Sequence, residues 1–279
     1  MKRESFLERL SYSMRWRLAT LGNGLRDAAA YRIEFFIEVL GSAVVPAAFQ
    51  LVLWWALFDG SGLTEVGGRT KQELILYTVF STLFTQIRGG NHDFEIQEMI
   101  RSGQLSQYLL RPVSVIEFVY LRGIVPKLIT AAACFILGVI LIPCLGIGSV
   151  LDGVMQMSMA MSMALLGNVI HYQIGAALSA TAFYWEEAYS VLMVKNMLVS
   201  LLSGELIPLT LFPEKYAWVW KSTPFYIYVF GPTELALGRW GPNEFVTHFG
   251  LGLVWFAGCY LLIKLGWGLA MKRYSSLGG

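Results

Sequence analysis

Long apolar runs constrain this chain more than any other feature. The stretches "IVPKLITAAACFILGVILIPCLGI" (124–147) and "HFGLGLVWFAGCYLLIKLGWGLAM" (248–271) are each long enough to cross a bilayer, since a transmembrane helix needs about 20 mostly apolar residues. Hydrophobic residues make up 56% of the chain and charged residues 14%, whereas a soluble domain has about 25% charged residues. We therefore predict an all-α membrane protein.

Six stretches are candidate transmembrane helices. They are residues 33–58, 73–90, 124–147, 153–183, 188–212 and 248–271. The second stretch is short and less apolar than the others, and the fourth is longer than a span requires. Six spans would place both chain ends on the same side of the membrane.

Residues 1–30 have the pattern of an amphipathic helix rather than of a span. Leucines recur at steps of three and four residues, and arginines occupy the other faces. Such a helix can lie in the headgroup region with its arginines toward anionic lipid. A helix packed on another part of the protein would show the same pattern. We predict an N-terminal interfacial helix.

The distribution of lysine and arginine predicts the orientation. Basic residues gather in the N-terminal segment, between residues 88 and 127, and at Lys272 and Arg273. Short loops rich in lysine and arginine stay in the cytoplasm. We therefore expect both termini and the segment 88–123 to be cytoplasmic. The turn at Glu186 and Glu187 fits less well, although acidic residues contribute little to this rule.

The segment 88–123 carries a short amphipathic helix of its own. Asn91 suits the N-cap, and Gly103 suits the residue just past the helix end. Acidic residues in the first turns favour the helix dipole. A second short piece follows and ends before Pro112. The pattern predicts the shape but leaves the partner open, because the apolar face could lie on the membrane or on another protein.

Two motifs resemble those of a known family. The stretch "IRSGQLSQYLLRPVS" (100–114) resembles the cytoplasmic signature of ABC-2-type transporter permeases, in a bacterial branch once described only as uncharacterised ABC permease components. The stretch "SGELIPLTLFPEKYAWVWKSTPFYIYVFGPTELALGR" (203–239) resembles the same branch. The resemblance implies a six-span domain over 31–279, a coupling helix at 91–103 and re-entrant helices within an extracellular segment, 206–246.

The resemblance also implies a function. The chain would be the permease subunit of an ATP-driven exporter in the bacterial inner membrane, working as a dimer of identical or related permeases. ATP and Mg²⁺ would bind separate ATPase subunits, and this chain would hold no cofactor. Met99 and Ile100 would anchor the ATPase, and charged residues would set the orientation. The coupling residues would be Phe94, Glu95, Glu98, Met99, Ile100, Arg101 and Gly103.

The residues before the last predicted span support the re-entrant helices independently of the resemblance. Pro208 and Pro213 disfavour an unbroken helix. Irregular backbone inside a membrane must be buried in protein or line a wet cavity. The aromatic stretch that follows is equally compatible with an ordinary interfacial belt.

Polar residues inside the spans are candidates for a translocation path. Asn168 and His171 share a helix face, with Gln173 close by. Glu205 lies at the outer end of the fifth span. Ionisable groups in a membrane are functional or paired by default. Each of these residues could instead make a structural hydrogen bond.

Two further sets of charged residues have a structural explanation. Glu34 and Glu38 lie on one face near the cytoplasmic end of the first span, with Arg32 close enough to neutralise them. Lys195 lies inside the fifth span, and we expect its side chain to extend to the cytoplasmic surface.

Several functions are not supported by motifs. The chain contains no G-x-x-x-x-G-K-[ST] phosphate loop, no H-E-x-x-H and no zinc-type cysteine spacing, so we expect no catalysis by this chain. A net charge of +2 does not favour nucleic-acid binding, and membrane lipids are the expected surroundings. The alternative function is an ATP-independent secondary transporter or channel. A scaffold, or an enzyme built around His171, is a third possibility.

Overall fold

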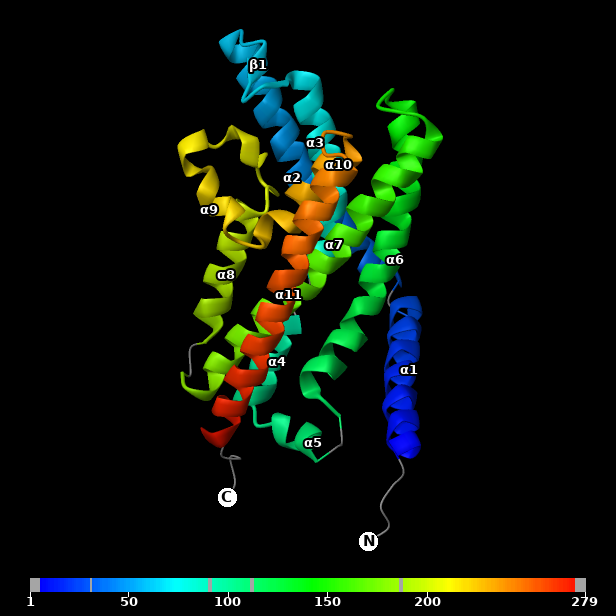
Figure 1. The fold of residues 1–279 in the computed structure, drawn as a ribbon, viewed down its shortest axis with the longest axis vertical. Helices are drawn as coiled ribbons and strands as arrows, with labels where there is room; N and C mark the ends of the chain where they lie inside the picture. Colours follow the sequence, from blue (N-terminus) through cyan, green and yellow to red (C-terminus); the bar gives the residue numbers. More distant parts are fainter. Residues whose placement is uncertain (1–5, 31, 90–91, 111–112, 186–187, 274–279) are drawn as a thin grey trace.

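The computed structural model describes residues 6–30, 32–89, 92–110, 113–185 and 188–273. Apart from loops and one hairpin of two short strands, these described residues are helical (Figure 1). In chain order the elements are α1 Phe6–Ala30, α2 Arg32–Ser61, β1 Glu65–Val66, β2 Arg69–Thr70, α3 Lys71–Arg88, α4 His92–Arg101, α5 Leu105–Leu109, α6 Val115–Cys144, α7 Val150–Ser179, η1 Ala180–Phe183, α8 Tyr189–Leu202, η2 Leu209–Leu211, η3 Glu214–Tyr216, α9 Ala217–Lys221, η4 Phe225–Ile227, α10 Phe230–Ala236, α11 Pro242–Ala270 and η5 Met271–Arg273.

Within the described residues, four helices are long and apolar enough to cross a membrane. They comprise Leu40–Gly60 within α2, all of α6, α7 with η1, and α11. These helices confirm the first, third, fourth and sixth predicted spans. Helix α6 begins at Val115, well before the predicted start at 124, because Ser114 caps it and Glu117 accompanies the cap.

The other two predicted spans form shorter helices. Helix α3 has 18 residues and is about 27 Å long. Its polar side chains Thr78 and Ser81 are buried in the protein and hydrogen-bonded, so the helix needs less apolar surface. Helix α8 has 14 residues, about 21 Å, and ends at Leu202 rather than at the predicted residue 212.

Helix α8 ends early because of the residues that come directly after it. Gly204 has a φ of +79°, in the left-handed region that favours glycine. A Cβ there would lie 2.7 Å from the Tyr77 hydroxyl and 2.8 Å from the Cβ of Phe230. Only glycine allows the chain to turn this close to α3 and α10.

Helix α7 is the centre of the molecule. It packs against α11, α6, α10, α3 and α4. The backbone of Tyr228 approaches so closely at Gly167 that an added Cβ would lie 3.0 Å from the Tyr228 Cα. The main buried cluster gathers around this helix and includes Phe80, Phe84, Met157, Met163, Ile170 and Phe230.

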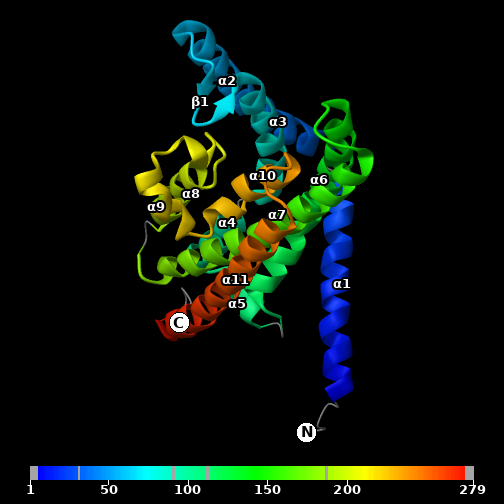
Figure 2. The ribbon, with the colours of Figure 1, turned by 45° about the horizontal axis from the view of Figure 1, so that its top comes forward.

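The elements divide between the two ends of the molecule. The start of α1, helix α5 and the end of α11 lie at the lower end in both views (Figures 1 and 2). The β1–β2 hairpin and the turn between α6 and α7 lie at the opposite end. The segment between α8 and α11 folds into short helices separated by prolines, with α9 beside the upper end of α8 (Figure 1).

Helix α1 packs beside the first half of α6. Arg17 forms an ion pair with Glu117, and Gly24 lies against the backbone carbonyl of Arg122. The interfacial position of α1 stays a prediction. Asn91, Glu186 and Glu187 lie outside the described residues, as do the side chains of Arg32, Glu34 and Glu38.

Candidate functional site

Among the described residues, three largely buried ion pairs join segments that lie far apart in the sequence. Asp93 of α4 pairs with Lys195 of α8. Arg88 at the end of α3 pairs with Glu205 across 2.8 Å. Arg69 of β2 pairs with Glu234 of α10 across 2.6 Å. Charged groups inside a membrane protein are costly unless paired, so these contacts tie together the elements that carry them.

The pair between Asp93 and Lys195 is the most deeply buried of those near α4. The two side chains are 4% and 3% exposed. The Ser179 hydroxyl also donates to the backbone carbonyl of Asp93 across 2.8 Å. A Cβ on Gly175 would lie 2.7 Å from the Asp93 side chain. Helix α4 is therefore held against both α7 and α8.

This arrangement corrects one expectation. Lys195 was predicted to extend to the cytoplasmic surface, and this is wrong, because its ammonium is buried against Asp93. A charged residue inside an apolar run signals a partner. The partner is 102 positions away in a segment predicted to be outside the membrane, so the sequence did not identify it.

Glu205 lies just beyond the end of α8. Its carboxylate accepts a hydrogen bond from the Arg88 guanidinium across 2.8 Å. Its backbone carbonyl accepts one from the Gln50 amide, also across 2.8 Å. The residue thus joins α2, α3 and the segment after α8. A role for Glu205 in a translocation path stays a prediction.

Asn168 hydrogen-bonds the last backbone carbonyls of helix α3. Its amide donates to the carbonyls of Ile87 and Arg88 across 2.9 and 3.2 Å. Its side-chain oxygen accepts from the Tyr120 hydroxyl across 3.1 Å. The last carbonyls of a helix lack partners within the helix, so Asn168 supplies one from α7. These bonds account for a buried asparagine without a transported substrate.

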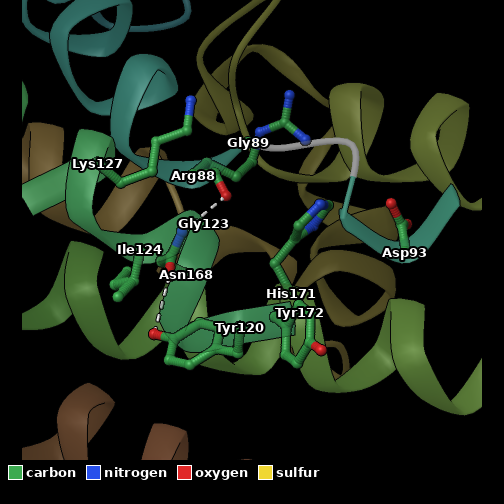
Figure 3. A pocket seen from close by; sticks show the side chains of 10 residues that line it. All are labelled: Arg88, Gly89, Asp93, Tyr120, Gly123, Ile124, Lys127, Asn168, His171 and Tyr172. Carbon is green, nitrogen blue, oxygen red and sulfur yellow. Dashed lines mark hydrogen bonds between the residues drawn. The ribbon is translucent and has the colours of Figure 1, made fainter. Parts of the chain in front are cut away.

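His171 lies one turn further along α7 and lines a small cavity with Asn168, as their shared helix face predicted (Figure 3). The other lining residues are Arg88, Gly89, Asp93, Tyr120, Gly123, Ile124, Lys127 and Tyr172. The imidazole is 6% exposed and meets the Tyr228 ring edge-on, with centroids 5.6 Å apart. Among the described residues, its Nδ1 has no hydrogen-bond partner. Gln173 is also buried but does not line the cavity.

The predicted pair of short helices after α3 is present as α4 and α5, and Gly103 has the positive φ, +73°, expected past a helix end. The choice of anchor residues needs correction. Met99 and Ile100 are 6% and 7% exposed and pack in the protein's own core with Val119 and Tyr172. The apolar face of α4 therefore covers the spans of its own chain and is not free for a partner.

The remaining predicted coupling residues divide into two groups. The Phe94 and Tyr189 rings meet at a tilt of 46°, with centroids 4.9 Å apart, and Glu95 forms an ion pair with Arg122. Glu98 and Arg101 are exposed. The coupling role of these remaining residues stays a prediction.

A further exposed surface continues past α4. We define the α4–α5 outer surface as the exposed residues Glu98, Arg101, Gln104, Gln107 and Leu110. Leu110 is 87% exposed, more than most other apolar side chains of the described chain. Leu110 is the C-cap residue of α5, and α5 lies at the lower end of the molecule (Figure 1).

The buried ion pair between Arg69 and Glu234, beside the β1–β2 hairpin, was not predicted from the sequence. Arg69 is fully buried, donates to Thr210 as well as to Glu234, and lies over the Tyr77 ring. The position of Arg69 in a polar loop gave no signal of burial. Glu234 inside the apolar stretch 225–236 was the available signal.

Four long apolar helices in the described part of the chain indicate a multi-pass membrane protein. Compared with models of known protein families, residues 44–278 match the model of the ABC-2 family transporter proteins. The chain therefore belongs to the ABC-2 transporter family, as the motifs at 100–114 and 203–239 indicated. No curated protein and no solved structure matches it significantly.

Proposed function

We propose that this chain is the permease subunit of an ATP-driven exporter and forms the translocation path as a dimer. Family membership over residues 44–278 carries the proposal. ABC-2 membrane subunits are typically not catalytic, so ATP and Mg²⁺ would bind separate ATPase subunits. The direction of transport rests on analogy with the family.

The proposed topology has six spans in a bacterial inner membrane. Helices α3 and α8 would join the four long apolar helices, with both termini, α4 and α5 in the cytoplasm. Two observations support this arrangement. The start of α1, α5 and the end of α11 lie at one end of the molecule, and basic residues gather in the corresponding segments. The short helices between Leu209 and Ala236 would enter the membrane from outside.

The α4–α5 outer surface is the proposed docking site for the ATPase. It combines an exposed leucine with charged and amide side chains, the mixture of apolar anchor and polar surroundings found at protein interfaces. It replaces the buried Met99 and Ile100 as the contact. Glu98 and Arg101 would set the orientation of the partner.

Packing beneath this surface supports the transmission of movement. Ile96 and Ile100 on the inner face of α4 pack with residues of α6 and α7. The pair between Asp93 and Lys195 adds α8. A displacement of α4 by the ATPase would therefore reach three spans directly, and shifts of two permease subunits would open the path between them.

Matched leucine variants test the docking site. Leu110 is 87% exposed beside α5, and Leu151 is 81% exposed at the opposite end, in the first turn of α7. An anchor residue contributes about 2–4 kcal/mol to binding, so Leu110→Asp should weaken ATPase association roughly 30-fold or more. Leu151→Asp should leave association unchanged. The measurement is the affinity of each purified variant for the ATPase in detergent.

The result distinguishes docking from folding. Both aspartates replace exposed side chains, so both variants should elute as folded protein in size-exclusion chromatography. Equal ATPase affinity for Leu110→Asp and the original chain would remove this surface from the interface. If the original chain retains no ATPase at all, the secondary-transporter function becomes the better account.

A further inference from the structure

We propose that the cavity between α3, α6 and α7 binds an anionic oxygen group, either a phosphate or a carboxylate. The group belongs to the headgroup of a lipid or to a small free anion. The cavity is the one lined by Arg88, Lys127 and His171 (Figure 3). This proposal concerns binding and does not depend on the docking of an ATPase.

Two buried nitrogen atoms in the cavity wall have no hydrogen-bond partner within the described part of the chain. His171 is 6% exposed, and its Nδ1 has no hydrogen-bond partner among the described residues. The same is true of the Arg88 Nε within the described chain, although the other end of that guanidinium is bonded to Glu205. Buried polar groups without a partner cost about 1–3 kcal/mol each, so both atoms point to something that satisfies them.

Neighbouring polar groups are already used inside the protein. Asn168 bonds the end of α3 and accepts from Tyr120. The Tyr172 hydroxyl donates to the carbonyl of Ile116 across 2.5 Å. These bonds hold the cavity wall in place and leave Arg88 and His171 as the groups available to a ligand.

The chemistry of the wall favours an anion over a cation. A guanidinium and an ammonium donate hydrogen bonds and accept none. Figure 3 shows the nitrogen ends of Arg88, Lys127 and His171 extending in the same direction. The nearby carboxylates are engaged, Asp93 by Lys195 and Glu205 by Arg88. A metal ion would therefore face two basic side chains, whereas an oxygen anion would receive charge-assisted hydrogen bonds.

The size of the cavity limits how much of the ligand enters. Its volume of about 20 Å³ is enough for the centre of roughly one water-sized group. One oxygen of a phosphate or carboxylate fits this space, and the body of an organic molecule does not. The ligand would therefore insert the oxygen of a larger headgroup, or of a small anion, between the helices. Basic pockets between transmembrane helices on the cytoplasmic side are known binding places for anionic headgroups.

Thermal stability of the full chain in detergent tests the proposal. Three probes are titrated: a short-chain phosphatidic acid, phosphatidylcholine with the same acyl chains, and inorganic phosphate. Tryptophan fluorescence follows unfolding, and a ligand that binds the folded state raises the melting temperature. We expect phosphatidic acid to stabilise the chain and phosphatidylcholine to have a smaller effect. A response to inorganic phosphate as well would identify a free anion as sufficient.

Variants at His171 and Gln173 test whether the stabilising anion binds in this cavity. His171→Phe keeps an aromatic ring against Tyr228 and removes both nitrogens, so the phosphatidic acid midpoint should rise by about tenfold. His171→Leu provides the same test if the phenylalanine variant does not fold. Gln173→Leu is the matched control. Gln173 is buried on the same helix, its side-chain oxygen has no hydrogen-bond partner among the described residues, and it does not line the cavity.

The outcomes separate the possibilities. Equal stabilisation by the anionic and zwitterionic lipids would show a general effect of lipid, and no stabilisation by any probe would show that no anion binds. Either result would overturn the proposal. An unchanged phosphatidic acid midpoint in the His171 variants would place the anion elsewhere and overturn it too. A shift in Gln173→Leu equal to that in His171→Phe would show a general effect on α7, which also contradicts the assignment.

Discussion

Replacing Lys195 by methionine is the sharpest test of the buried contact between α4 and α8. Lys195→Met keeps a long, flexible side chain and removes the ammonium. Asp93 would then be left at 4% exposure without its cationic partner. Removing one member of a buried ion pair typically costs 3–5 kcal/mol, because the remaining charge is uncompensated. The ratio of folded to unfolded protein should fall roughly 100-fold to several thousand-fold.

Two further variants separate charge from packing. Lys71→Met removes the cation of the exposed pair with Asp59 and should cost about 0–1 kcal/mol. The double change Asp93→Asn with Lys195→Met leaves no buried charge, so it should recover most of the lost stability. Together with Asp93→Asn alone, these variants complete a double-mutant cycle for the pair.

The assay is reversible unfolding in mixed detergent micelles at neutral pH, followed by tryptophan fluorescence. Each variant yields a free energy of unfolding relative to the original chain. If Lys195→Met costs no more than Lys71→Met, the structural argument for a buried, mutually dependent pair is wrong. If the double variant is no more stable than Lys195→Met, the loss comes from packing of the lysine side chain rather than from an unpaired Asp93.

Three other outcomes follow from the same structure. A cysteine at position 102, introduced as Ser102→Cys in a cysteine-free background, should react with an impermeant reagent only after the cells are opened; labelling from outside intact cells would reverse the proposed topology. Glu205→Ala leaves the Arg88 guanidinium without its carboxylate and should lower the melting temperature in detergent, whereas Ser200→Ala, whose bond to Glu205 is 3.4 Å long, should change it little; equal melting temperatures for both would contradict the ion pair. Ile100→Asp places a carboxylate in the protein's own core and should abolish the folded peak in size-exclusion chromatography, and a folded Ile100→Asp that loses only its ATPase would restore Ile100 as an anchor.

Hydropathy predicted the long helices well because their outer faces meet lipid. Helix α11 shows this most clearly, since its exposed residues from Leu251 to Leu262 are all hydrophobic or aromatic. Helix α3 was harder to recognise because it is buried in protein. Thr78 on α3 accepts a hydrogen bond from Trp54 on α2, so polar residues are tolerated there and lower the apolar signal.

The amphipathic pattern of α4 was recognised, but its meaning was not. An apolar helix face shows that something covers it and does not show what. Met99 and Ile100 are covered by the protein's own helices. That assignment depends on contacts with residues of α6 and α7 distant in sequence, which periodicity does not contain.

The buried pairs were beyond sequence reasoning for a related reason. Lys195 and Glu234 each stand out as charges in apolar surroundings, so the need for a partner was visible. Their partners, Asp93 and Arg69, lie in polar segments where many charges compete. Which of these charges forms the ion pair depends on spatial proximity, and only the three-dimensional structure shows that proximity.

ATP hydrolysis after co-reconstitution tests the central claim most directly. The claim is that this chain is a membrane subunit without catalytic activity that controls a separate ATPase. The full chain is purified from its native host with the proteins that accompany it, and the same chain is also prepared alone; both are placed in liposomes. We predict that an ATPase co-purifies, that hydrolysis requires it, and that the permease increases its rate. Hydrolysis by the chain alone, or purification with no ATPase partner, would contradict the account.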